Sequence, residues 1–215
     1  TGNIGADYVA NSRPDGHTLV IASLSNIINQ ATGNATANLI NDFTPVCFSG
    51  GVLYAMLVPN ELPAKNVAEL VELARKEPGK LTYASAGNGT SIHLAGEVFA
   101  SMAGVQMTHI PYKGSGPAVT DMLGGQVDLM FDSITSARPH IQSGKLRALA
   151  VTDPARATEL PDVPTLAEAG VPGIDLVTWI GFLTPAGVDK AIITKLNQEI
   201  VRILQLREVR EQLSA

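Results

Sequence analysis

The chain has 215 residues, of which 45% are hydrophobic and 16% are charged. This length allows one large domain or two smaller ones, and this composition is typical of a globular protein with a packed core. Lysines and arginines number 15 against 20 aspartates and glutamates, and the formal net charge is -5. Because binding to a phosphate backbone needs clustered basic side chains, and no basic run occurs, we expect no nucleic-acid partner.

Apolar runs and the single cysteine set further limits. The longest apolar runs, such as Val52–Pro59, fall far short of the roughly 20 residues that a membrane-spanning helix needs. Cys47 lies in an apolar, strand-like run, so we expect a small core residue, no internal disulfide and no thiolate metal cluster. No signal peptide is recognisable, and Thr1–Ala10 already has a helical pattern, which is compatible with a preceding segment.

Short β-branched runs alternate with amphipathic stretches along the chain, a pattern that favours βαβ units and a mostly parallel sheet. Strands are expected at His17–Ser23, after a turn at Arg13–Gly16, and at Val52–Val58. A helix is predicted at Val67–Lys76, because its apolar residues recur at helical spacing.

Two units follow in which a strand ends in glycines and polar residues that lead directly into a helix. Their strands, loops and helices are predicted at Lys80–Ser85, Ala86–Ser91 and Ile92–Met102, then at Met107–Tyr112, Lys113–Gly116 and Pro117–Leu123. A further strand, Val127–Ser133, carries Asp132 near its end. Because ligands of open α/β sheets bind at the carboxyl ends of strands, we expect the two loops and Asp132 to converge on one cleft.

The C-terminal part is predicted to contain a strand at Lys145–Thr152, a strand pair around Leu176–Gly187 and a helix at Asp189–Leu204. An apolar stripe at helical spacing predicts that this helix faces a core. We expect the chain to cross between two lobes at Pro59–Asn66 and at the proline-rich Glu159–Gly173.

The loop Ala86–Ser91 has the composition of an anion site. Gly87 and Gly89 permit backbone dihedrals that other residues avoid, so successive amide N–H groups can turn inward. Thr90 or Ser91 can cap the following helix, whose N-terminus adds partial positive charge and unpaired donors. Such a site binds a carboxylate or a phosphate without lysine or arginine. The alternative is a glycine-rich turn that only starts a helix.

Nucleotide-binding motifs are not matched by this loop, because no lysine follows Gly89 and Ile92 stands where a third glycine belongs. A second loop repeats the arrangement with Ser115 and the amides of Gly114 and Gly116. Neighbouring Lys113 either pairs with ligand charge or is solvated. Tyr112 either lines a pocket or covers the core.

Catalytic patterns are scarce. No G-x-S-x-G or H-E-x-x-H motif occurs, and the four histidines, His17, His93, His109 and His140, lack metal-ligand partners at short spacing. His93 either satisfies a nearby backbone group or acts as a base. Asp132 is a candidate general base, but it can equally accept a ligand donor or orient water.

Five stretches in order along the chain resemble the Bug family of periplasmic solute-binding proteins, the receptors of tripartite tricarboxylate transporters. These stretches are Gly2–Val20, Leu62–Phe99, His109–Asp132, Ser143–Thr152 and Leu160–Gly173.

The resemblance implies an α/β, two-lobed, hinged receptor of the type II-like, Venus flytrap kind that closes on a small organic acid, with no cofactor and no metal. It implies lobes at 1–58 with 174–215 and at 59–173. The ligand-binding residues that it implies are Ser23 and Asn26 in the first lobe, and Ala86, Gly87, Asn88, Gly89, Thr90, Ser91, Gly114, Ser115 and Asp132 in the second. The loop is implied to hold one ligand carboxylate through backbone amides and ordered water.

Both ends depart from the family pattern. Members begin with a strand, a ligand-contacting loop and a helix that are not present before Thr1, and Ala215 falls short of the usual final segment. The first lobe is therefore expected to be incomplete, with an exposed sheet edge and part of the pocket missing.

The leading hypothesis is a non-enzymatic periplasmic receptor that delivers a mono-, di- or tricarboxylate, an amino acid or an aromatic acid to membrane transporter subunits. One alternative is a small-acid enzyme that uses Asp132 or His93. Another is a scaffold or sensor protein that keeps the fold without binding solute. The sequence does not specify which carboxylate is bound.

Overall fold

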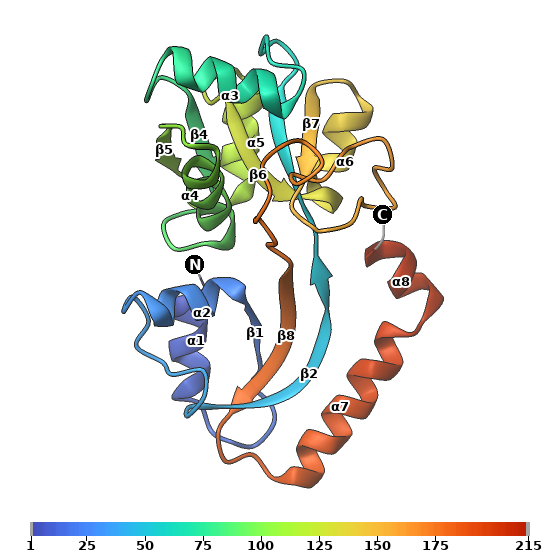
Figure 1. The fold of residues 1–215 in the computed structure, drawn as a ribbon. Coiled ribbons are helices and arrows are strands. Elements are labelled where there is room, and N and C mark those ends of the chain that lie inside the picture. The colour runs from blue at the N-terminus through green and yellow to red at the C-terminus, as the bar shows by residue number, and fades with distance from the viewer. Residues whose placement is uncertain (1, 214–215) are drawn as a thin grey trace. The chain divides into compact units, whose positions relative to one another are not determined.

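The computed structural model describes residues 2–213, and Thr1, Ser214 and Ala215 lie outside this described part. The chain forms two compact units. The first unit combines residues 1–51 with 178–215, and the second is the continuous segment 52–177. Figure 1 shows the helices and strands of each unit, coloured along the chain.

The first unit contains a three-stranded sheet with the order β1-β8-β2. Its strands are β1 (Val20–Ser23), β2 (Phe43–Val52) and β8 (Thr178–Pro185). β1 pairs antiparallel with β8, with Val20 opposite Leu183. β1 is therefore an edge strand of this sheet, and its Ile21 is 61% exposed. The predicted strand pair around Leu176–Gly187 is wrong, because that stretch supplies the single strand β8.

Helices of the first unit are α1 (Asn3–Ala10), α2 (Leu24–Ala31), α7 (Lys190–Leu204) and α8 (Arg207–Leu213). α2 begins with a capping box in which Asn26 Oδ1 accepts a hydrogen bond from the Ser23 backbone N–H at 2.9 Å. α7 forms as predicted after Asp189, whose side chain accepts from the Ala191 N–H at 2.7 Å. None of its residues is buried, so the prediction that its apolar stripe faces a core is wrong.

The second unit contains a five-stranded sheet with the order β5-β4-β6-β3-β7. Its strands are β3 (Tyr54–Pro59), β4 (Thr82–Ser85), β5 (Thr108–Pro111), β6 (Leu129–Ser133) and β7 (Leu146–Val151). β4 runs parallel to β5 and to β6, as predicted. β3 is antiparallel to both of its neighbours, β6 and β7. The sheet is therefore mixed, and only its β5-β4-β6 part has the parallel order that the alternating pattern predicts.

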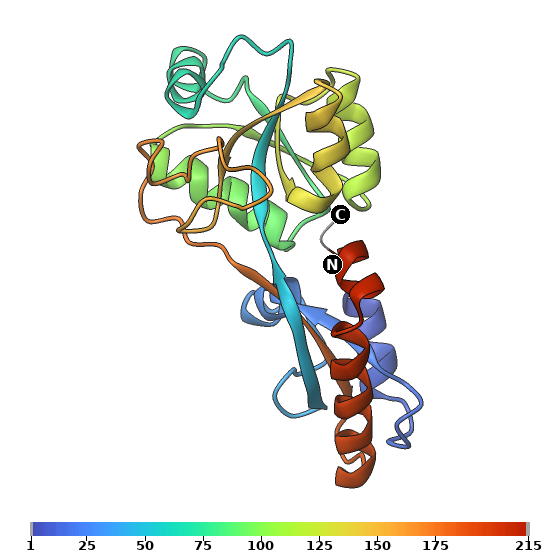
Figure 2. The ribbon, with the colours of Figure 1, turned by 90° about the vertical axis from the view of Figure 1, so that its right-hand side faces the viewer.

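Helices cover both faces of this sheet: α3 (Val67–Lys76), α4 (Ser91–Ala103), α5 (Ser115–Leu123) and α6 (Ile134–Gln142). Figure 2 shows α3 and α4 on one face and α5 and α6 on the other. The crossovers β4-α4-β5 and β5-α5-β6 thus pass on opposite faces, as in doubly wound sheets. Across the described residues of both units, no helix combines the length and the apolar character needed to span a membrane.

The core of the second unit is large and continuous. Every residue of β3 is buried, and Phe99 of α4 and Phe131 of β6 are buried beside each other, with ring centroids 6.1 Å apart. α4 approaches β4 closely at Gly96, where an added Cβ would overlap the Tyr83 ring. A glycine at this position therefore sets the distance between helix and sheet.

The unit boundaries differ from the predicted ones. The lobe bounds implied by the family resemblance assign 52–58 and 174–177 to the first lobe, whereas both stretches belong to the second unit. The reason for 52–58 is that β3 pairs with β6 and β7, which no local pattern reveals. For 174–177, the reason is that Ile174 is buried in the core of the second unit.

Candidate functional site

Three helix starts lie at one edge of the second unit. Because β4, β5 and β6 are parallel, their carboxyl ends meet at that edge, and α4, α5 and α6 begin there. The residues at the three N-caps are Thr90, Gly114 and Ser133. Each helix start presents backbone N–H groups and the positive end of a helix dipole, so this edge favours negatively charged ligands.

The loop between β4 and α4 has the backbone that its glycines predict. Gly87 has φ of 125° and Gly89 has φ of 74°, both in the region that L side chains avoid. Thr90 caps α4, because its Oγ1 accepts from the His93 N–H at 3.2 Å and donates to the Gly87 carbonyl at 2.8 Å. Buried Ser85 holds the other end, where its Oγ accepts from the Gly87 N–H at 3.1 Å. The loop is thus fixed from both sides.

The second loop, between β5 and α5, lies against the first. The Tyr112 N–H donates to the Ser85 carbonyl at 3.0 Å, and the Tyr112 carbonyl would lie 3.2 Å from a Cβ on Gly87. Any side chain at Gly87 would therefore press on the second loop as well as strain the first. The structure brings the predicted loops Ala86–Ser91 and Gly114–Ser115 together at one edge.

Tyr112 and Lys113 differ in their surroundings. The Tyr112 hydroxyl donates to Asp121 Oδ2 at 2.8 Å, and burial together with this carboxylate raises the pKa of Tyr112. Tyr112 is half-buried and packs against the core of the second unit, whereas Lys113 is exposed.

Within the first loop, Asn88 is exposed and Ser91 is buried. Ser91 Oγ lies 2.7 Å from the Tyr54 hydroxyl, a partner on β3 that the sequence does not indicate.

Asp132 is buried at the end of β6 and serves as a hydrogen-bond acceptor. Its Oδ2 accepts from Ser115 Oγ at 2.6 Å and from Ser136 Oγ at 2.7 Å. Its Oδ1 accepts from the Ser133 N–H at 2.9 Å. The carboxylate therefore links the starts of α5 and α6. Ser136 is missing from the predicted site, although its position four residues after Asp132, in the first turn of α6, is a usable signal.

Aromatic rings stack beside the first loop. The His109 ring lies 4.8 Å from the Tyr83 ring and 4.1 Å from the His93 ring, measured between centroids. His109 Nε2 lies 2.6 Å from Ser85 Oγ, and His93 Nδ1 accepts from the Gly89 N–H at 3.3 Å. His109 therefore contacts the residue before the glycine loop, and His93 contacts Gly89 within it.

The Glu97 carboxylate of α4 lies beside two of these rings. The Tyr83 hydroxyl donates to Glu97 Oε1, and His93 Nε2 lies 3.8 Å from the same oxygen. Burial, then the hydrogen bond to Glu97 and its charge, raise the pKa of Tyr83. Burial lowers the pKa of His109, and a charge on nearby His93 lowers it further, while Glu97 acts in the opposite direction.

Ser23 and Asn26, the predicted contribution of the first lobe, lie in the first unit at the start of α2. Asn26 is 6% exposed, and its side chain lies 3.4 Å from the position of a Cβ on Gly2. Their local geometry is a capping box, and their role toward a ligand stays a prediction.

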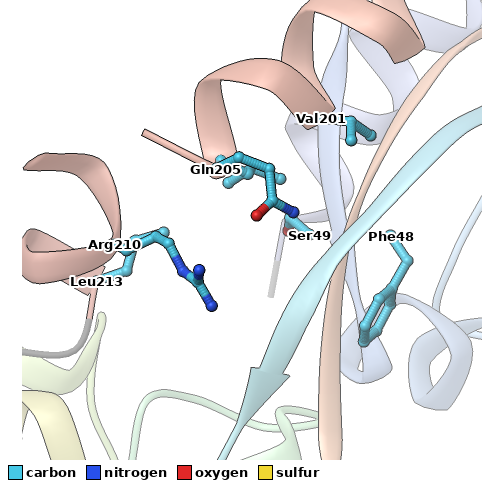
Figure 3. Close-up of a pocket in the computed structure, with 7 residues that line it drawn as sticks. Phe48, Ser49, Val201, Gln205, Arg210 and Leu213 are labelled. Atoms are coloured by element: carbon cyan, nitrogen blue, oxygen red, sulfur yellow. The ribbon is translucent and has the colours of Figure 1, made fainter. Parts of the chain in front are cut away.

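A groove in the first unit coincides with none of the predicted site residues. It has a volume of about 330 Å³ and is lined from β2 by Phe48 and Ser49 and from the helices mainly by Val201, Gln205 and Arg210. Figure 3 shows the Gln205 amide and the Arg210 guanidinium directed into this groove. Phe48 is 66% exposed, so the groove is an open surface feature. Among residues 2–213, no three His, Cys, Asp or Glu side chains are grouped to hold a metal ion.

Solved structures define the class of the fold. The chain is similar to the periplasmic binding protein BugD, with a TM-score of 0.92 and 33% identity over 99% of this chain and 71% of that one. It is similar to MatC from Rhodopseudomonas palustris with bound malate, with a TM-score of 0.93 and 32% identity over 99% and 73% of the two chains. It is also similar to R. palustris Rpa4515 with adipate, with a TM-score of 0.89 and 36% identity over 97% of this chain and 70% of that one. The fold is that of the α/β periplasmic binding proteins.

The family follows from the sequence profile described as tripartite tricarboxylate transporter family receptor, which matches residues 1–215. The chain belongs to this family, and the predicted Bug-family membership is confirmed. It is 41% identical to a UPF0065 protein from the tcbD-tcbE intergenic region of Pseudomonas sp. strain P51, over 99% of this chain and 64% of that protein. It is 36% identical to BugT of Bordetella pertussis, over 100% of this chain and 67% of that protein. The chain thus spans about two thirds of the length of these relatives.

Proposed function

We propose that this chain belongs to a non-enzymatic periplasmic receptor that captures a small organic carboxylate and delivers it to a tripartite tricarboxylate transporter. The observation that carries the proposal is the meeting of three helix starts with the glycine loop at one edge of the second unit. Family membership supports the role of a receptor. Malate and adipate, named with two similar structures, support a carboxylate as the ligand class.

Binding of the carboxylate rests on amide donors. The N–H groups of Gly87, Gly89 and Thr90 donate within the protein, to Ser85, His93 and the Gly87 carbonyl. These bonds and the positive φ of the two glycines fix the loop so that the start of α4 can face an anion. Fixed donors of this kind neutralise a carboxylate without a buried cation, which suits a chain with more acidic than basic residues. The loop should hold one ligand carboxylate, in part through ordered water.

Asp132 and the α5 start complete the proposed site in the second unit. Gly114 and Ser115 add backbone N–H groups, and Asp132 fixes the Ser115 and Ser136 hydroxyls. Ser23 and Asn26 are the proposed contacts from the first unit, which is the proposed first lobe. Closure of the two lobes on the ligand is the proposed working motion.

Isothermal titration calorimetry of the chain with malate, adipate, succinate, aspartate and benzoate tests this function. We expect saturable binding of at least one of these acids. Gly89→Val should weaken that binding by at least about tenfold, because a β-branched side chain cannot adopt the φ of 74° that aims the loop amides.

Gly104→Val is the matched control. Gly104 also has positive φ, of 62°, but it ends α4 at the opposite end from the loop. Gly104→Val should lower the free energy of unfolding by a similar amount and leave the affinity for the acid unchanged. If the intact protein binds none of these acids, the receptor proposal fails and the scaffold alternative gains support. If the protein converts an acid to a product and Asp132→Asn abolishes this turnover, the enzyme alternative replaces the receptor proposal.

A further inference from the structure

We infer that the site selects an acid that carries its own hydrogen-bond donor, a hydroxyl or an ammonium group, beside a carboxylate, and that Ser115 determines this preference. The inference rests on the proposed function, because it names the class of acid that the same site takes. The observation that carries it is the direction of the hydrogen bonds around Asp132, where two serine hydroxyls point their protons at the carboxylate.

Asp132 fixes the direction of these two hydroxyls. Its Oδ2 accepts from Ser115 Oγ at 2.6 Å and from Ser136 Oγ at 2.7 Å, and a carboxylate oxygen has no proton to return. Because Asp132 is buried, turning either hydroxyl away would leave a buried charge short of a donor. Each serine has one hydroxyl proton, and Asp132 holds it. Toward a ligand, both oxygens can therefore only accept hydrogen bonds.

Ser115 offers the more open of the two acceptors. Ser136 Oγ already accepts from Ser133 Oγ at 3.2 Å, which uses one of its two acceptor positions. Within residues 2–213, Ser115 Oγ accepts no hydrogen bond, so both of its acceptor positions are available. Ser115 is half-buried at the first residue of α5, where a ligand at the helix start can reach it.

The start of α5 places donors beside this acceptor. α5 has no side-chain cap, and the N–H groups of a first helical turn have no partner within the helix. Pro117 lacks an N–H, so the donors are the backbone N–H groups of Ser115 and Gly116, which suit a carboxylate.

Ser115 thus combines a backbone donor with a side-chain acceptor in one residue. The complementary acid carries a carboxylate for the N–H groups and, on the next carbon, an O–H or N–H for Ser115 Oγ. Malate and aspartate have this combination. Succinate has the same carbon skeleton without the donor, so its binding would leave the Ser115 acceptor without a partner.

Isothermal titration calorimetry with malate, aspartate and succinate tests the inference, because these acids differ only in the hydroxyl, ammonium or hydrogen on one carbon. Adipate and benzoate, which also lack a donor, complete the series. We expect malate or aspartate to bind at least about tenfold more tightly than every acid without a donor. The tighter of these two identifies the donor as a hydroxyl or an ammonium group.

Three variants assign the preference to Ser115. Ser115→Ala removes the acceptor and should reduce the preference to about twofold or less, by weakening the binding of the donor-carrying acid. Ser115→Thr keeps the hydroxyl and should keep the preference. Thr120→Ala is the matched control, because it removes from α5 a hydroxyl that donates to the Gly116 carbonyl at 3.1 Å and not to Asp132.

The preference is a ratio of two affinities measured on the same variant, so a general loss of stability does not change it. Binding of any acid without a donor as tightly as malate and aspartate, or a preference that survives Ser115→Ala, would overturn the inference and leave the proposed function standing. Failure of the native protein to bind any of the five acids is a different result, which removes the proposed function and the inference together.

Discussion

Asp132 illustrates what a single residue does at this edge. Asp132 is 3% exposed, and its carboxylate accepts from the Ser115 and Ser136 hydroxyls and from the Ser133 N–H. A buried charge is stable only when such donors surround it. The sequence places Asp132 at the end of a strand and suggests several roles for it. The structure adds that its first role is to orient two hydroxyls, because the partners come from α5 and α6 as well as from its own strand.

Replacement of Asp132 by asparagine tests this arrangement. An amide can accept on one side only, so either the two hydroxyls at Oδ2 or the Ser133 N–H at Oδ1 lose their acceptor, and the charge is lost from the remaining bonds. The free energy of unfolding should therefore fall by about 1.5–3 kcal/mol. Ser136→Ala removes one donor and leaves the carboxylate, so it should lower the free energy of unfolding by less than Asp132→Asn does. Denaturant unfolding of both variants measures the difference; a cost for Asp132→Asn no larger than that of Ser136→Ala would contradict the assignment.

His109 gives a second prediction at this scale, on the pH dependence of stability. Burial and the neighbouring His93 lower its pKa in the folded chain from the ordinary value of 6.5. The unfolded chain therefore takes up the proton first as the pH falls. The contribution of His109 to stability is complete above about pH 6.5 and is lost as the pH falls through the lower folded pKa.

Unfolding of the native chain and of His109→Gln at a series of pH values between about 8 and about 5 measures this contribution. The gap between the two curves should change below about pH 6.5, with the native chain losing more free energy than the variant. Parallel curves over the whole range would show that His109 does not titrate differently in the two states.

At the scale of elements, strong local patterns give reliable predictions and weak ones fail. α3, α4 and α5 form where glycine loops, caps and apolar spacing predict them. α6 is not predicted, because Pro139 lies inside it and few apolar residues mark its face. β3 is predicted as a strand, but its antiparallel pairing with β6 and β7 is not, since partner choice depends on residues far away in the chain.

The contact between α4 and β4 yields a prediction at this scale. Gly96→Ala places a Cβ against the buried Tyr83 ring, so α4 must shift and the free energy of unfolding should fall by about 1–3 kcal/mol. Gly5→Ala in α1 is the matched control, because no atom lies within 4 Å of its added Cβ and alanine favours a helix. Thermal or denaturant unfolding compares the two; a neutral Gly96→Ala would show that the helix packs more loosely than described.

At the scale of the whole molecule, the two units differ in how they are built. The second unit is continuous in sequence, from Val52 to Val177, and holds the larger core. The first unit joins two distant segments around the small core Ala6, Val9, Ala22, Phe43 and Leu183. Since stability depends on the apolar area buried by each core, the second unit should be the more stable one.

Expression of residues 52–177 alone tests this difference. We expect a folded protein with dispersed amide resonances and a cooperative denaturant transition, because both strand neighbours of β3 are included. It should also keep the loop Ala86–Ser91 and Asp132 in place. A chain without a cooperative transition would show that the second unit depends on the first.

The sequence by itself determined the elements and residues whose signals are local. Gly87, Gly89 and Thr90 specify the loop and the start of α4, because positive φ and capping depend on adjacent residues. Only the tertiary structure decided that Ser136 joins Asp132, that His93 holds Gly89, and that residues 52–58 belong to the second unit. Strand pairing and side-chain contacts of these kinds arise between separate elements, and their geometry is set when those elements pack around a common core.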